Sequence, residues 1–122
     1  MTRPYTRYAS LAGKLVFISG GSSGIGAELV RAFAEQGARV AFCGTRPDGG
    51  RELIDELAAA GHAAPWYTAV DVRDTAAYQA ALARLIAGAG PVQVLVNNAG
   101  RDDRHRMEDV TSEFWDDRLS LN

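Results

Sequence analysis

The chain of 122 residues has little sulfur and little net charge, and each shortage excludes a class of protein. Its single cysteine, Cys43, excludes an intrachain disulfide framework and a cysteine-rich metal site, and it favours a reducing compartment. Thirteen basic and fifteen acidic residues give a net charge of −2, which provides no electrostatic footprint for nucleic acid. The N-terminal apolar run, Leu15 to Ile18, is too short for a signal peptide or a membrane span. We therefore expect a cytoplasmic protein without a nucleic-acid or membrane partner.

Short runs of β-forming residues alternate with stretches of helical periodicity along a single expected domain, residues 1–122. The expected strands are Lys14–Ser19, Arg39–Cys43, Trp66–Val72 and Val92–Val96. The expected helices are Gly24–Gly37, Arg51–Ala60, one capped by Asp74 and one that starts near Ser112 after the cap Thr111. Such alternation requires right-handed crossovers. It predicts an α/β fold of Rossmann type, a doubly wound parallel sheet in three αβα layers, incomplete with strands 1–4 only in the order 3-2-1-4.

A glycine-rich segment, SGGSSGIG from Ser19 to Gly26, lies between the first expected strand and the first expected helix. Glycine there permits backbone conformations closed to other residues and lets a pyrophosphate approach the N–H groups of the helix N-terminus. A P-loop is excluded because no Gly-Lys-Ser/Thr follows and the only lysine is Lys14. The position of the segment favours a nucleotide-binding turn over a plain glycine-rich turn.

Four segments share one pattern of order and spacing: Ser19–Gly26, Asp71–Val72, Asn97–Gly100 and Leu121–Asn122. In that pattern the chain resembles the short-chain dehydrogenase/reductase family, with serine at position 19 where the family usually has threonine. The resemblance implies an oxidoreductase that transfers hydride between a nicotinamide and an alcohol or carbonyl carbon. It also implies a set of cofactor-binding residues: Gly20, Ser22, Ser23, Gly24, Ile25, Gly26, Asp71, Val72, Asn98, Ala99 and Gly100.

Individual roles follow from the same resemblance. The three family glycines of the turn and Ile25 would lie along the pyrophosphate, Asp71 would accept a hydrogen bond from the adenine amino group, and Val72 would pack against the ring. For Asp71 a strand-end cap is the alternative. Asn97 resembles the family's strand-stabilising residue, and Asn122 matches the family's catalytic asparagine.

The choice of nicotinamide cofactor depends on the end of the second expected strand, which reads Cys43-Gly44-Thr45-Arg46-Pro47. An acidic residue there would accept the ribose hydroxyls and repel a 2′-phosphate, and none is present. Arg46 can pair with the phosphate through charge-assisted hydrogen bonds. The sequence therefore favours NADP, with NAD as the alternative cofactor and a solvated surface side chain as the alternative for Arg46.

The family's chemistry uses a tyrosine as acid and base with a lysine four residues later, and the chain contains no Tyr-x-x-x-Lys. The chain ends at Asn122, before the family's serine, tyrosine and lysine would appear. We interpret it as the N-terminal, cofactor-binding half of a dehydrogenase, inactive by itself. A non-catalytic nucleotide-binding module or sensor is the alternative, and a dimer element that associates through its last helix is a third reading.

The segment from Arg101 to Arg106 reads RDDRHR and is polar at every position. Together with the preceding Asn97–Gly100 it resembles a subgroup of sugar dehydrogenases that oxidise aldoses at C1, so we expect a small-molecule substrate of this kind; an exposed charged loop is the alternative. His62 and His105 have no metal-ligand spacing, so no metal is expected. As for other members of the family, a homo-oligomer is expected.

Overall fold

A parallel sheet forms the centre of the computed structural model, which describes residues 6–101 and 105–122. Its strands are β1 (Leu15–Ser19), β2 (Arg39–Gly44), β3 (Trp66–Ala69) and β4 (Val94–Val96). They are hydrogen-bonded in the order β3-β2-β1-β4, and every neighbouring pair is parallel. The predicted α/β class and the strand order 3-2-1-4 are confirmed.

The third and fourth strands are shorter than the sequence predicts because their neighbours limit the pairing. Ala69 pairs with Gly44, the last residue of β2, and Val70 adds only a final backbone hydrogen bond to the Gly44 oxygen at 2.8 Å. At the other end, Gln93 donates to the Leu15 oxygen at 2.9 Å before β4 begins. The ladder therefore ends where the partner strand does, which hydrophobicity alone does not reveal.

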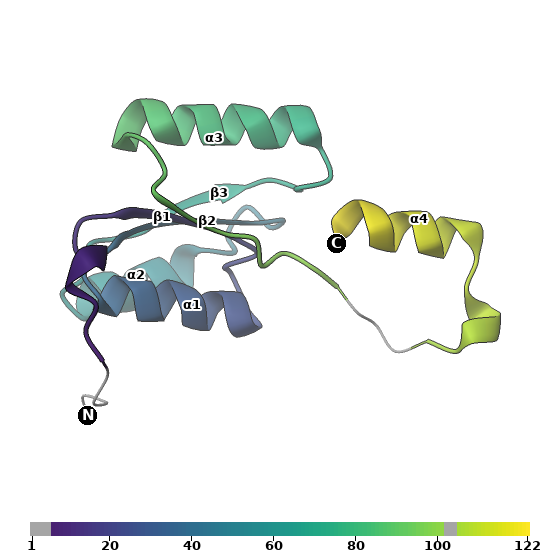
Figure 1. The fold of residues 1–122 in the computed structure, drawn as a ribbon, viewed down its shortest axis with the longest axis horizontal. Helices are drawn as coiled ribbons and strands as arrows, with labels where there is room; N and C mark the ends of the chain where they lie inside the picture. Colours follow the sequence, from purple (N-terminus) through teal and green to yellow (C-terminus); the bar gives the residue numbers. More distant parts are fainter. Residues whose placement is uncertain (1–5, 102–104) are drawn as a thin grey trace.

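Helices cover both faces of the sheet (Figure 1). The helices are α1 (Gly24–Glu35), α2 (Arg51–Ala59), α3 (Thr75–Ala89) and α4 (Ser112–Leu121), with short 3-10 turns at Ala9–Leu11 and Met107–Asp109. Figure 1 shows α1 and α2 on one face, α3 on the other and α4 to one side of the sheet. The layers agree with the predicted αβα arrangement.

The predicted helix boundaries have identifiable causes. The Asp74 carboxylate accepts from the Ala77 N–H and the Thr111 hydroxyl from the Phe114 N–H, both at 3.1 Å, so both predicted caps are confirmed. Helix α1 ends at Glu35, two residues before the predicted stop, and Gly37 has φ +81°, a backbone conformation that favours glycine.

The two faces of the sheet bury two apolar clusters. One contains Val16, Ile18 and Phe42 with side chains of α1 and α2, and the other contains Phe17 and Cys43 with side chains of α3. Cys43 is 1% exposed and packs as a small hydrophobe, and this burial raises the pKa of its thiol. Strand β1 is buried along its whole length because it lies between β2 and β4 and under both helix layers.

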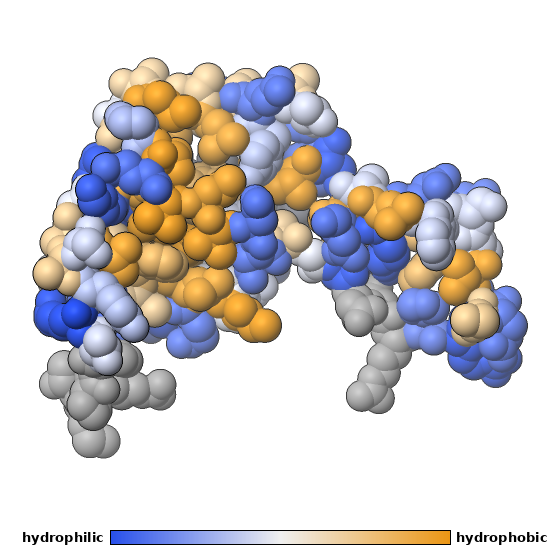
Figure 2. Space-filling model, viewed as in Figure 1, coloured by the Kyte–Doolittle hydropathy of each residue, from blue (hydrophilic) through white to orange (hydrophobic). Residues whose placement is uncertain are grey.

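Strand β4 lies at one edge of the sheet. Figure 2 shows apolar residues gathered between α3 and α1 on the face that it views. Leu95 of β4 is 57% exposed. In the described part of the chain, no helix has both the length and the apolar character that crossing a membrane requires.

We predict that Phe42→Ala lowers the free energy of unfolding by about 3–5 kcal/mol, because it empties a fully packed site in the core. The Phe42 side chain is 1% exposed and packs against Gly21, where a Cβ atom would lie 2.7 Å from Phe42 Cβ. Urea unfolding would measure the change, with Phe33→Ala as the control because Phe33 is only partly buried against the same cluster. Equal losses in the two variants would contradict the prediction.

Candidate functional site

The glycine-rich turn leads from β1 into α1 with a backbone that only glycine accommodates. Gly20 and Gly24 have φ values of +71° and +55°, in the left-handed region that favours glycine. A Cβ atom at position 26 would lie 2.0 Å from the Gly20 carbonyl oxygen, so Gly26 is required by close packing instead. These three predicted glycines therefore have two separate physical roles.

Hydrogen bonds join this turn to the loop that follows β4. The Ser19 hydroxyl, 4% exposed as a residue, accepts from the backbone N–H groups of Asn98 and Ala99 at 3.1 Å each. The Asn98 side-chain amide donates to the Gly20 oxygen, also at 3.1 Å. The serine hydroxyl at position 19 thus holds the turn, and Asn98 has a supporting contact that the sequence motif did not reveal.

A cleft of about 380 Å³ opens between the glycine-rich turn, the end of β2 and the β4 loop. Its lining contains the predicted residues Gly20, Ser22, Ser23, Ile25, Gly26, Asn98, Ala99 and Gly100. It also contains Gly44, Thr45 and Leu121, which stand in the segments named above but were not predicted to bind the cofactor. The structure therefore gathers residues from three loops and the end of α4 around one space.

The first turn of α1 borders this cleft and suits an anion. The first N–H groups of a helix have no partner within the helix and carry a partial positive charge. The side chain of Ser23, the N-cap residue, makes no capping hydrogen bond with them. Because Gly26 brings no side chain, a phosphate has access to the backbone there, and Ile25, which also lines the cleft, is 76% exposed.

The predicted residues Gly24, Arg46, Asp71, Val72 and Asn122 lie outside the lining of the cleft. Arg46 is exposed in the turn after β2 and adjoins Thr45, which does line the cleft. Val72 is half-buried and packs against the cluster under α3, so part of its surface already serves the core.

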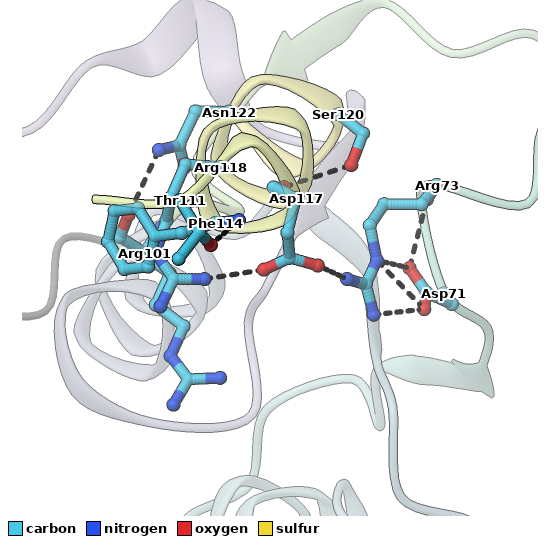
Figure 3. A network of polar contacts seen from close by, with 9 residues as sticks. All are labelled: Asp71, Arg73, Arg101, Thr111, Phe114, Asp117, Arg118, Ser120 and Asn122. Atoms are coloured by element: carbon cyan, nitrogen blue, oxygen red, sulfur yellow. Dashed lines mark hydrogen bonds and ion pairs between the residues drawn. The ribbon is translucent and has the colours of Figure 1, made fainter. Parts of the chain in front are cut away.

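Asp71 is held by Arg73 at the end of β3 (Figure 3). The Arg73 Nη2 donates to Asp71 Oδ2 at 2.8 Å, and the Arg73 backbone N–H donates to Oδ1 at 2.9 Å, which makes Asp71 a strand-end cap as well. These hydrogen bonds from the guanidinium and the backbone lower the pKa of the Asp71 carboxyl below its ordinary value. Asp71 is therefore ionised at neutral pH and acts as an acceptor.

Arg73 continues the network into α4. Its Nη1 donates to Asp117 Oδ1 at 2.5 Å, and Asp117 Oδ2 accepts from Arg118 at 2.5 Å (Figure 3). Asn122, at the end of the same helix, clamps the backbone of Arg101: its Oδ1 accepts from the Arg101 N–H at 2.7 Å and its Nδ2 donates to the Arg101 oxygen at 2.9 Å. The predicted catalytic asparagine is thus positioned beside the loop that follows β4.

Part of the predicted substrate loop, Asp102, Asp103 and Arg104, lies outside the described residues. His105, which belongs to the same loop, contacts the Phe114 ring, with the two ring centroids 4.6 Å apart. Within residues 6–101 and 105–122, no group of three or more His, Cys, Asp or Glu side chains could hold a metal ion.

A parallel sheet of order 3-2-1-4 with a glycine-rich turn after its first strand defines a Rossmann-type fold. A sequence model described as short chain dehydrogenase matches residues 14–122. The chain therefore belongs to the short-chain dehydrogenase family, as the resemblance of its motifs implies.

Curated relatives in this family include sugar dehydrogenases. A probable galactose dehydrogenase of Rhizobium meliloti (strain 1021) is 46% identical over 122 residues, which are 100% of this chain and 48% of the relative. A D-xylose 1-dehydrogenase of Caulobacter vibrioides (strain NA1000 / CB15N) is 46% identical over 115 residues, which are 94% of this chain and 44% of the relative. The chain spans about half the length of these relatives.

Solved structures of the family have the same fold. A short chain dehydrogenase from Mycobacterium smegmatis superposes with a TM-score of 0.87 at 30% identity, covering 98% of this chain and 50% of that chain. An actinorhodin polyketide ketoreductase variant with NADPH superposes with a TM-score of 0.82 at 31% identity, covering 95% of this chain and 43% of that chain.

We predict that Gly26→Ala destabilises the chain by about 1–3 kcal/mol, because the new methyl group meets a backbone oxygen that cannot rotate away. Gly88→Ala is the matched control: Gly88 lies in α3 with open space around it, so alanine there is expected to stabilise by about 0.5–1 kcal/mol. Thermal unfolding of both variants would measure the changes. A stabilising Gly26→Ala would show that the close contact is absent.

We predict that Arg73→Ala raises the pKa of Asp71 toward the ordinary carboxyl value. Because the folded-state pKa is lowered, the pair stabilises the fold above about pH 4 and loses this effect as pH falls through the folded-state value. Carboxyl-carbon NMR titration would follow Asp71 directly. Asp117→Ala is the control, since it removes the other partner of Arg73 and leaves the pair with Asp71; a similar pKa change in that variant would contradict the assigned cause.

Proposed function

We propose that the chain is the cofactor-binding part of an NADP-preferring short-chain dehydrogenase that acts on a small sugar, with residues 1–122 as one Rossmann domain. The observation that carries the proposal is the glycine-rich turn, where residue 26 lies so close to the Gly20 oxygen that no side chain fits and bare backbone faces the cleft at that position. The galactose and xylose dehydrogenases among the relatives support a sugar substrate. The ketoreductase with NADPH supports NADP over NAD.

The residues of the cleft suit the parts of a dinucleotide. A bound nicotinamide cofactor would accept or supply the hydride. The N–H groups that open α1 would bind the pyrophosphate, with Gly20, Gly24 and Gly26 along it. Ser22, Ser23 and Ile25 would border the same phosphates, and Asn98, Ala99 and Gly100 would border the cofactor from the opposite wall.

At the adenosine end, charge decides the orientation and the choice of cofactor. Asp71, kept ionised by Arg73, would accept from the adenine amino group by sharing its oxygens with the guanidinium. Val72 would present the uncovered part of its side chain to the ring. Arg46, exposed beside Thr45, would pair with the 2′-phosphate that distinguishes NADP from NAD.

Asn122 would act from the substrate side, where its clamp on Arg101 orders the loop after β4. The sequence contains no Tyr-x-x-x-Lys, so the proton-transfer pair of the family is not among these residues. We therefore propose that the 122 residues alone bind NADP but do not oxidise D-galactose or D-xylose. Turnover by homogeneous material free of host enzymes would contradict this part of the proposal.

The remaining expectations extend the proposal. A cytoplasmic location suits the single cysteine, which is buried and reduced. Association with a second copy suits α4, where Trp115 and Leu119 are 60% and 64% exposed. A non-catalytic nucleotide-binding module is the second candidate, because the cleft beside the glycine-rich turn would serve such a module equally well.

The proposed cofactor choice is tested by Arg46→Ala. We predict that it weakens NADP binding by about 1–3 kcal/mol and leaves NAD binding nearly unchanged, because only NADP carries the phosphate that the guanidinium would meet. Calorimetric titration with NADP and NAD measures both affinities. Arg51→Ala, at the exposed start of α2, is the control for a general loss of positive charge; equal weakening of both cofactors in the Arg46 variant would contradict the assignment.

A further inference from the structure

Tyr67 of β3 fills the space beneath the turn that joins β2 to α2. Its ring packs on Phe42 with centroids 5.1 Å apart, and its hydroxyl donates a hydrogen bond to the Arg46 carbonyl oxygen. Glycines of the turn make room for it: a Cβ atom would lie 2.4 Å from Tyr67 Cγ at Gly50 and 2.8 Å from the Tyr67 hydroxyl oxygen at Gly49. The turn therefore packs directly against the Tyr67 side chain, and the two glycines leave the space that this side chain occupies.

The hydrogen bond from Tyr67 is made to the backbone of Arg46, the residue whose guanidinium would meet the 2′-phosphate of NADP. The Arg46 oxygen also accepts from the Gly49 N–H at 3.1 Å, which closes the turn Arg46-Pro47-Asp48-Gly49. Tyr67 is thus the second donor to the same carbonyl, and it comes from the sheet rather than from the turn itself. It ties the Arg46 backbone to a rigid strand.

The turn is held from the other side by the glycine-rich loop. A Cβ atom at Gly44 would lie 2.6 Å from the Ser22 hydroxyl oxygen and 3.0 Å from that of Tyr67. The end of β2 therefore packs between Ser22, which lines the cleft, and Tyr67. Burial raises the pKa of Tyr67, so its hydroxyl keeps its proton and remains a donor at neutral pH.

We propose that Tyr67 is a positioning residue for cofactor selectivity, which holds the Arg46 backbone so that the guanidinium is directed to the 2′-phosphate of NADP. The inference rests on the proposed function, because it presupposes that Arg46 meets this phosphate. Without the hydroxyl the side chain of Arg46 samples more directions in the free protein. Ordering it against the 2′-phosphate then costs more entropy, which weakens the binding of NADP and not that of NAD.

The test is a double-mutant cycle with Tyr67→Phe, Arg46→Ala and the combined variant, titrated with NADP and with NAD. Tyr67→Phe keeps the ring and its packing on Phe42, so the fold is expected to persist, which thermal unfolding checks. Tyr78→Phe is the matched control, since Tyr78 is a half-buried tyrosine packed on Phe17 on the opposite face of the sheet.

We expect Tyr67→Phe to weaken NADP binding about threefold to tenfold and to change NAD binding by less than about twofold, the scale of one lost hydrogen bond. In the Arg46→Ala background the same substitution is expected to have no effect on NADP binding, and Tyr78→Phe is expected to leave both affinities unchanged. A lower affinity for both cofactors in Tyr67→Phe, or the same loss of NADP affinity in the Arg46→Ala background, would overturn the inference.

Failure of the proposed function gives a different result. If the parent chain binds neither cofactor, or if Arg46→Ala leaves the preference for NADP intact, the phosphate contact and the inference fall together. If Arg46→Ala abolishes the preference and Tyr67→Phe preserves it, only the role of Tyr67 is wrong.

Discussion

The backbone carbonyl of Gly20 is the point where the parts of the cleft meet. It lies 2.0 Å from the place that a Cβ of residue 26 would occupy, and it accepts a hydrogen bond from the Asn98 amide at 3.1 Å. The close approach of Gly26 packs the start of α1 against the turn, and the hydrogen bond from Asn98 joins the turn to the loop after β4. Because both contacts use the same oxygen, the two walls of the cleft have one common support.

The support extends into the core through β1. Ser19, the last residue of β1, holds two N–H groups of the β4 loop on its hydroxyl. A buried hydroxyl without partners would cost free energy, so satisfying it with two donors also fixes where β4 ends relative to β1. The site is thus ordered by the same interactions that satisfy the buried polar groups of the sheet.

The helix α4 is placed by a different kind of interaction. Its polar contacts include the ion pair from Asp117 to Arg73 and the clamp of Asn122 on the Arg101 backbone (Figure 3). Exposed ion pairs contribute little to stability. Their effect here is geometric, since one arginine contacts both Asp71, at the proposed adenine position, and the helix that ends in Asn122.

The sequence by itself determined the elements and their order, and tertiary contacts decided how the site is supported. Strand and helix periodicity, the caps Asp74 and Thr111 and the glycine-rich turn are local signals, legible because each involves residues close together in the chain. The family motifs likewise indicated most of the residues around the cleft. The contacts from Asn98 to Gly20 and from Tyr67 to Arg46 join residues 78 and 21 positions apart, and no period or spacing predicts them. Strand ends and side-chain partners depend on what lies across the sheet, which only the folded chain brings together.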